Sequence, residues 1–486
     1  MSLGGNARTH RAETPPDTVA EAVPTPDTAP RSARNGLRAL LLRLHFHAGV
    51  FVAPFLVIAA LSGLLYVFTP QLDEMVYDDV VHVPDAATSL PLAEQVRAGT
   101  AARPDDTLMA VRPGTAGTDA TQVIFEAPDL PPSYRRTAFV DPHTGDVTGV
   151  LETYGSGQAL PIRAWVDNLH RGLHLGDAGR LYSELAASWL WVVAAGGAVL
   201  WISKRRRRSL LRPEPGATGR RKVLSRHGAT GLWIALGLVF LSATGLTWSQ
   251  YAGANIGDVR AALSWETPAV SAELPASAGS AAPGDAGVDD GAPAGTGADV
   301  GWDRVVRTAR DHGLGGDIEV LPPDGAGAAY VVQQTGRQWP SQQDSVAIDP
   351  ANARVVETLR FEDYPLIAKL ARWGIDAHMG LLFGWVNQIV LVALGLGLLG
   401  VIFWGYRMWW LRRPRRGTRG GFGRPPARGA WRRVPGTVLT PLIVVVALIG
   451  YFVPLLGVSL LGFLAWDALL GWRARRSGGA RRRTAS

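Results

Sequence analysis

The chain has 486 residues, of which 47% are hydrophobic and only 19% are charged, too little charge for an average soluble protein. The high apolar content also excludes a chain that is disordered throughout. The sequence contains no cysteine, which excludes disulfides, thiolate zinc sites, cysteine-ligated iron–sulfur clusters and covalently attached c-type haem. The formal net charge of +8 comes mainly from arginine, because only 3 of the 49 basic residues are lysine.

The chain opens with a polar segment and continues with long apolar runs. Residues 1–35 are rich in Pro, Thr and Ala and predict a disordered cytoplasmic tail. Four later runs each reach the roughly 20 residues that a helix needs to cross a bilayer, and they lack the polar stripe of a soluble helix. These predicted membrane spans are residues 44–68, 185–203, 228–249 and 381–411.

A fifth apolar stretch, residues 437–472, is too long for one span and is interrupted by Pro454 and Gly457. Arginines lie on both sides of it. A helical hairpin keeps both groups of arginines in the cytoplasm, as the positive-inside bias prefers, whereas a single span separates them. We therefore predict an α-helical hairpin that is followed by a basic tail, residues 473–486.

The charges of the connecting segments predict the orientation. The loop 204–226 has 10 basic residues and 1 acidic residue, and the loop 412–433 has no acidic residue. In contrast, residues 70–184 and 250–376 have 17 and 18 acidic residues. Because cytoplasmic loops are enriched in Lys and Arg, we expect a multi-pass protein of the plasma (inner) membrane with both termini in the cytoplasm.

The two acidic segments predict two small extracytoplasmic α+β domains, residues 70–168 and 250–376. Each contains one amphipathic helix and alternating strand patterns. The predicted helices are residues 90–100 and 302–312, and the predicted strands are residues 122–126, 137–140, 330–334 and 345–348. Residues 266–300, rich in Ala, Gly, Pro and Asp, read as a linker inside the second domain.

The sequence repeats itself. The pattern L-H-x-x-x-G around His45 recurs as R-H-x-x-x-G around His227, 182 residues later. The pattern H-x-G-L at His170 recurs at His378, 208 residues later, and the linker accounts for the longer shift. A unit of span, outer domain and span is therefore used twice. This predicts a duplicated four-helix core bundle with a pseudo-two-fold axis, plus the terminal hairpin.

Equivalent histidines lie at the ends of the predicted spans. His45 and His227 open two spans at the cytoplasmic face, and His170 and His378 precede the other two at the outer face. A pseudo-two-fold axis brings equivalent residues face to face. Bis-histidine haem needs two imidazoles from different helices, each about 2 Å from one iron. These four residues are therefore the candidate ligands of haem iron, and no catalytic side chain is assigned.

Two further histidines are secondary candidates. His47 lies two residues after His45, so the two side chains diverge by roughly 200° and only one can face a given haem. His174 lies four residues after His170 and could form a Zn or Cu chelate with it on one helix face. Alternatively, all these interfacial histidines only cap helices or bind lipid headgroups.

Several motifs point to a family. The L-H-x-x-x-G and S/T-G-L patterns of the spans, the stretch L-H-R-x-L-x-L-G at residues 169–176 and H-x-G-x-L-F-G at 378–384 resemble the PepSY-associated transmembrane family. That family includes iron-regulated inner-membrane proteins and haem-b ferric-siderophore reductases. The resemblance implies PepSY-like outer domains, two b haems and reduction of ferric chelates outside the membrane.

The remaining expectations concern partners. No nucleotide-binding or hydrolase motif is present, and the cytoplasmic loops are too short for a flavin or nicotinamide domain. Electrons must then come from a separate cytoplasmic donor or a membrane quinol. The expected partners are membrane lipid and a ferric siderophore or other ferric chelate, and not nucleic acid. Two hypotheses remain: a transmembrane di-haem reductase, or a non-enzymatic membrane protein that binds peptides, proteases or metal.

Overall fold

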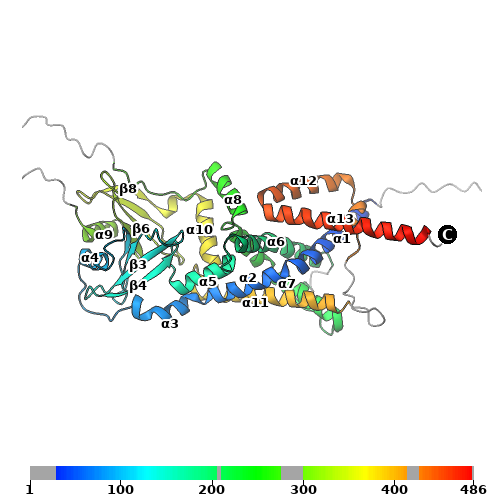
Figure 1. Ribbon diagram of the computed structural model, residues 1–486, viewed down its shortest axis with the longest axis horizontal. Helices are drawn as coiled ribbons and strands as arrows, with labels where there is room; N and C mark the ends of the chain where they lie inside the picture. Colours follow the sequence, from blue (N-terminus) through cyan, green and yellow to red (C-terminus); the bar gives the residue numbers. More distant parts are fainter. Residues whose placement is uncertain (1–28, 205–209, 275–298, 413–425, 484–486) are drawn as a thin grey trace, which may run out of the picture.

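The protein is elongated, with a β-sheet at one end and a helical bundle at the other (Figure 1). The computed structural model describes residues 29–204, 210–274, 299–412 and 426–483. Parts of five predicted segments therefore lie outside the described residues: the tail 1–35, the loops 204–226 and 412–433, the linker 266–300 and the tail 473–486.

Within the described residues, four helices are long and apolar enough to cross a membrane, or up to five if one bent helix pair counts as a single span, and one of the four is Pro454–Arg473 in the C-terminal part of the chain. Three of the long helices are α6 (Gly176–Ile202), α7 (Gly219–Leu246) and α11 (Gly384–Trp410). The bent pair is α1 (Ala29–Phe51) and α2 (Ala53–Val67). Helix α1 thus begins inside the range that the sequence predicts as a tail.

The bend of 59° between α1 and α2 has a local cause. Pro54 lies in the first turn of α2 and has no N–H to donate to the carbonyl four residues earlier, that of Val50. The Tyr406 hydroxyl of α11 donates to this Val50 oxygen instead, at 2.8 Å. A tertiary hydrogen bond therefore replaces the missing helical one.

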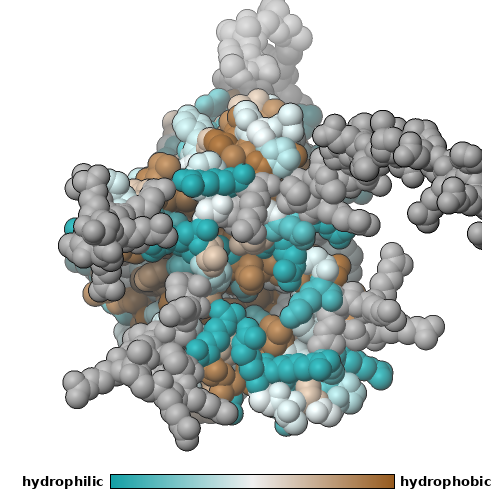
Figure 2. All heavy atoms as spheres, turned by 90° about the vertical axis from the view of Figure 1, so that its right-hand side faces the viewer, coloured by the Kyte–Doolittle hydropathy of each residue, from teal (hydrophilic) through white to brown (hydrophobic). Residues whose placement is uncertain are grey.

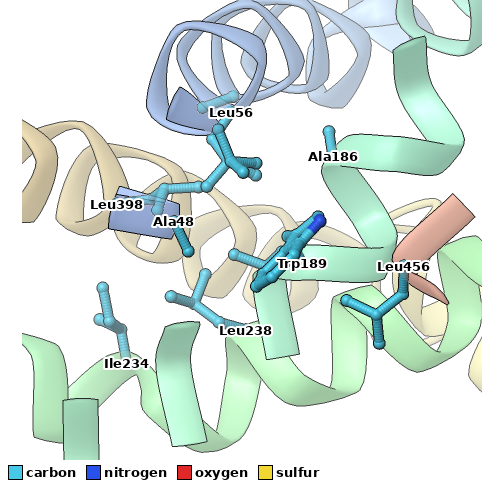
Figure 3. Close-up of a cluster of buried hydrophobic side chains, with 11 residues drawn as sticks. Ala48, Leu56, Ala186, Trp189, Ile234, Leu238, Leu398 and Leu456 are labelled. Carbon is cyan, nitrogen blue, oxygen red and sulfur yellow. The ribbon is translucent and has the colours of Figure 1, made fainter. Parts of the chain in front are cut away.

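The bundle core lies between α1, α2, α6, α7 and α11. Trp189 of α6 is its largest side chain, and Figure 3 shows it between Leu238 of α7 and Leu456 of the C-terminal helix. Its indole Nε1 donates to Ser459 Oγ at 2.9 Å. This buried donor is therefore satisfied by the C-terminal helices, which pack against the outside of the bundle.

The C-terminal helices are α12 (Gly436–Phe452) and α13 (Pro454–Arg483), and they form a hairpin. At the turn, a methyl group on Gly450 would lie 3.0 Å from Cα of Gly457, so the helices approach closely. Asp467 of α13 pairs with Arg43 of α1 and, at 3.0 Å, with Arg428. The hairpin is thereby anchored to the helix that carries His45.

The segments that the sequence predicts to be extracytoplasmic, called the outer segments here, contain the strands and the shorter helices. The first segment has α3 (Thr69–Val81), α4 (Leu92–Ala102), β1 (Leu108–Arg112), β2 (Thr121–Phe125), β3 (Tyr134–Val140), β4 (Val147–Tyr154) and α5 (Pro161–Gly172). The second has α8 (Tyr251–Ala262), α9 (Trp302–Asp311), β5 (Ile318–Leu321), β6 (Tyr330–Gln334), β7 (Ser345–Ile348), β8 (Val355–Leu359) and α10 (Leu366–His378). Two 3₁₀ turns, Phe361–Asp363 and Ala430–Arg433, complete the described elements.

The two outer segments share one antiparallel sheet, in the order β4-β3-β2-β1-β5-β6-β7-β8. They join where Val111 of β1 pairs with Val320 of β5, beside an ion pair of 2.9 Å between Arg112 and Glu319. Helices α4 and α9 lie side by side on the sheet (Figure 1). The two expected domains are thus joined edge to edge, which pairs two strands that would otherwise be exposed edges.

Helices α5 and α10 connect the sheet to the bundle and end in tight turns. After α5, Leu173 and His174 have φ of 52° and 55°, and after α10, Gly380 has φ of 82°. These left-handed residues end one helix and redirect the chain into the next span. His170 and His378 therefore lie in the last turns of two connecting helices, at the boundary between sheet and bundle.

Candidate functional site

The structure brings His45 and His227 together at the end of the bundle away from the β-sheet, and we call them the inner pair. His45 comes from α1 and His227 from α7, and their ring centres are 6.2 Å apart with the ring planes at 76°. The sequence repeat predicts this meeting of equivalent residues from different helices. The contact places two imidazoles within reach of a single metal ion.

Each ring of the inner pair is fixed through its Nδ1. His45 Nδ1 lies 3.1 Å from the Val193 carbonyl of α6, and His227 Nδ1 lies 2.8 Å from the Val401 carbonyl of α11. A carbonyl only accepts, so each Nδ1 carries the proton and donates it. Each neutral imidazole then has its lone pair on Nε2, the arrangement that orients metal-binding histidines in proteins.

The second pair, His170 and His378, is called the outer pair. Its rings are also fixed through Nδ1, but the acceptors are hydroxyl oxygens. His170 Nδ1 lies 3.0 Å from Ser62 Oγ of α2, and His378 Nδ1 lies 2.6 Å from Thr244 Oγ1 of α7. Each hydroxyl has a carbonyl of its own helix within 2.8 Å to which it donates its proton. The hydroxyl oxygens are therefore free to accept from Nδ1, and again Nε2 keeps the lone pair.

The outer histidines lie outside the candidate spans and are partly buried. Burial, and secondly the neighbouring His170 imidazole, lower the pKa of His378 to about 3. Burial also lowers the pKa of His170. Both rings are therefore neutral at physiological pH, the protonation state that metal ligation requires.

A glycine on a neighbouring helix faces each histidine ring. A methyl group on Gly197 would lie 2.8 Å from His45 Cε1, and one on Gly63 would lie 3.1 Å from His170 Cε1. The corresponding distances are 3.7 Å from Gly405 to His227 and from Gly245 to His378. Small residues let the rings approach the neighbouring helices closely.

A cavity of about 300 Å³ lies beside the inner pair. Its walls come from α1, α2, α6, α7 and α11 and consist mainly of Leu, Val, Ala and Gly side chains. Within the described residues, no acidic side chain lines it. Cofactor and ligand pockets typically enclose about 300–1,000 Å³ and are mostly apolar, so this cavity suits a flat apolar ligand.

The inner pair fits one haem iron. Iron–imidazole bonds are about 2 Å long and a ring nitrogen lies about 1 Å from its ring centre, so two axial imidazoles have centres about 6 Å apart. The observed separation is 6.2 Å. Within the part of the chain that the structure describes, no group of three or more His, Cys, Asp or Glu side chains could hold a bare metal ion. A porphyrin would supply the other four ligands itself.

A family model described as the PepSY-associated TM region matches residues 42–412. The chain belongs to the PepSY-associated transmembrane family. This confirms the family that the sequence motifs indicate, and the match contains all four paired histidines. Family membership and the long apolar helices together make the chain a multi-pass membrane protein. No curated protein matches it.

In this PepSY-associated protein, the two secondary histidines face away from the pairs. His47 Nδ1 lies 2.8 Å from the Arg43 carbonyl, and the His47 ring packs against Phe463 of α13 with ring centres 5.1 Å apart. The His174 ring packs against Trp165 at 4.9 Å. Because α5 ends at Gly172, His174 does not share a helix face with His170, and the premise of a chelating pair on one helix is wrong.

Sequence reasoning missed a buried charge cluster next to the outer pair. Asp376 of α10 is fully buried, and its carboxylate lies 2.9 Å from Arg372 and 3.9 Å from Arg337. Burial raises the pKa of Asp376, while the two arginines oppose the rise. The spacing of Arg372 and Asp376 by four residues was visible in the sequence, but Arg337 comes from a loop of the sheet. The cluster ties the sheet to the helix that carries His378.

Proposed function

We propose that the core of this protein is a duplicated bundle whose two units each provide one histidine to each site. Equivalent contacts support the duplication. The acceptors Val193 and Val401 are separated by the same 208 residues as His170 and His378. Ser62 and Thr244 are separated by the same 182 residues as His45 and His227. On this proposal the two halves of the sheet are a pair of PepSY-like units.

We propose that His45 and His227 hold one b haem, and that His170 and His378 hold a second. The observation that carries this proposal is the 6.2 Å separation of the inner rings, with Nδ1 of each ring anchored and Nε2 left as a ligand. When bound, haem supplies one-electron chemistry, because its iron alternates between Fe(III) and Fe(II). The residues of the chain orient the ligands, keep them neutral and exclude water.

The two sites lie near opposite ends of the bundle. On α7, His227 belongs to the inner site and Thr244, which accepts from His378, marks the outer one. They are 17 residues apart, or about 25 Å at about 1.5 Å per residue. A pair of redox sites spaced across the membrane supports electron transfer through the bundle rather than chemistry at one face.

The proposed activity is reduction of a ferric siderophore or other ferric chelate on the extracytoplasmic side for iron uptake. A separate cytoplasmic donor or a membrane quinol gives up each electron, and one ferric ion accepts it and becomes Fe(II). The chelate binds Fe(II) weakly and releases it. On this proposal the protein is a transmembrane oxidoreductase of the plasma (inner) membrane, with both termini and the arginine-rich segments in the cytoplasm.

Sealed proteoliposomes of known orientation test the activity. Reductant is enclosed with the inner face, and a ferric siderophore with an Fe(II) indicator is added outside. We expect colour only with the haem-loaded protein, and loss of colour when either histidine pair is replaced. If the haem is reduced but no outside ferric chelate ever receives electrons, the protein binds haem without being a reductase. A folded, colourless protein from haem-replete cells would favour the non-enzymatic alternative.

The outer site gives a separate prediction. His170→Ala is expected to remove the outer haem, because its ring has the anchored Nδ1 and faces the bundle. His174→Ala is the matched control, since this ring packs on Trp165 instead, and we expect it to keep both haems. A pyridine haemochrome assay on detergent-purified protein measures the content. The reverse result, with haem lost only from His174→Ala, contradicts the proposed pairing.

A further inference from the structure

Three arginines line the cavity at its inner end. Arg38 comes from α1, Arg220 from the start of α7 and Arg412 from the segment just after α11, and Lys204 lines the same cavity. Figure 2 shows the end of the molecule at which they lie, where hydrophilic residues surround a few hydrophobic ones. The apolar cavity therefore has a cationic rim on one side only.

The charges of the three rim arginines are not balanced by a carboxylate among the described residues. Among the described residues, none of the three arginines forms an ion pair with a carboxylate, and no acidic side chain lines the cavity. The Arg412 guanidinium lies over the Phe46 ring, 5.8 Å from its centre. Burial and then the nearby Arg220 lower the pKa of Arg412. Like charges held this close repel one another unless an anion lies between them.

The rim has the same symmetry as the inner histidines. Arg38 and Arg220 are 182 residues apart, as His45 and His227 are. Lys204 and Arg412 are 208 residues apart, the shift of the other half of each repeat unit. Two cationic positions thus come from each repeat unit. They surround the same cavity that the histidine pair lines, so the rim and the pair can contact one ligand.

We propose that Arg38, Arg220 and Arg412 bind the two carboxylates of the ligand that fills this cavity, the propionates of haem. The proposal rests on the function proposed above. A haem is a flat apolar ring with two carboxylates at one edge, so an apolar pocket with cations at one end matches both parts. Guanidinium groups bind carboxylates through paired, charge-assisted hydrogen bonds. The arginines then orient the inner haem with its propionates towards the cytoplasm.

The test uses binding to the full chain rather than activity. Haem b and its dimethyl ester, which lacks both carboxylate charges, are titrated into apoprotein in detergent. We expect the unmodified protein to prefer haem by on the order of 10- to 100-fold at the inner site. The double variant Arg220→Gln/Arg412→Gln should lose most of this preference. It should also lower the reduction potential of the inner haem, because nearby positive charge favours Fe(II).

Two controls keep the outcomes distinct. Arg34→Gln changes an exposed arginine about one turn before Arg38 that does not line the cavity, so it should retain the preference. The double variant Arg220→Lys/Arg412→Lys keeps the positive charges and should retain part of the preference for haem over its dimethyl ester. Both haems could bind while the preference for haem over its dimethyl ester is equal in the unmodified protein and the double variant. The arginines would then bind another anion, such as a lipid headgroup. That result would overturn this inference but not the proposed function. If the unmodified protein binds no haem, the proposed function fails with it.

Discussion

Replacing His45 or His227 with alanine is expected to lower the haem content from about two per chain to about one and to abolish transmembrane reduction of ferric chelates. On the proposed pairing each ring would hold the haem iron from one side, and the two ring centres are 6.2 Å apart. Alanine removes a ligand without filling the cavity. The measurement is a pyridine haemochrome assay, together with the loss of one low-spin component from the visible spectrum.

His47→Ala is the matched control for this prediction. His47 lies on the same helix as His45, two residues later, and its ring packs against Phe463 of α13. His47 does not line the cavity, and its Nδ1 bonds the Arg43 carbonyl instead. We expect it to retain both haems. If His47→Ala lost the inner haem while His45→Ala kept it, helix α1 would have to be rotated in the membrane, and the site would need to be rebuilt around His47. Thermal unfolding curves show whether each variant is folded.

The meeting of His45 with His227 could be predicted from the sequence because an internal repeat carries three-dimensional information. Two copies of one unit in the same orientation imply a pseudo-two-fold axis, and such an axis brings equivalent residues together. The acceptors of Nδ1 were partly visible, since Ser62 and Thr244 belong to the S/T-G-L pattern. The carbonyls of Val193 and Val401 were not, because a backbone acceptor leaves no mark on the residue type.

Other features depend on contacts between distant segments. Nothing in the pattern of β1 or β5 indicates that they pair with each other, so two separate domains were expected in place of one eight-stranded sheet. The bounds of helix α5 were not predicted from the sequence. Because this helix ends at Gly172, His174 is not on the same helix face as His170. Arg220 and Arg412 of the cavity rim lie in predicted loops where arginine is common for reasons of membrane orientation, so the sequence does not single them out.

Gly197→Ala is expected to weaken the inner haem site, whereas Gly405→Ala is expected to leave it nearly unchanged. The new methyl group would lie 2.8 Å from His45 Cε1 in the first variant but 3.7 Å from His227 Cε1 in the second, which is ordinary contact. His45 has little room to retreat, because its Nδ1 bonds the Val193 carbonyl four residues before Gly197 on the same helix. Overpacking of this kind costs about 1–3 kcal/mol, or about 5- to 150-fold in haem affinity.

Competition with a haem-binding apoprotein of known affinity measures the haem affinity of each variant. Gly197 and Gly405 occupy equivalent positions in the repeat, so the two affinities can be compared directly. The two variants carry the same chemical change on repeat-related helices, so general effects of alanine on helix stability cancel in the comparison. The low-spin visible spectrum should shift in Gly197→Ala because the His45 ring must tilt. Equal haem affinity in the two variants would contradict the tight contact between Gly197 and His45. A loss confined to Gly405→Ala would place the tighter contact on His227 instead.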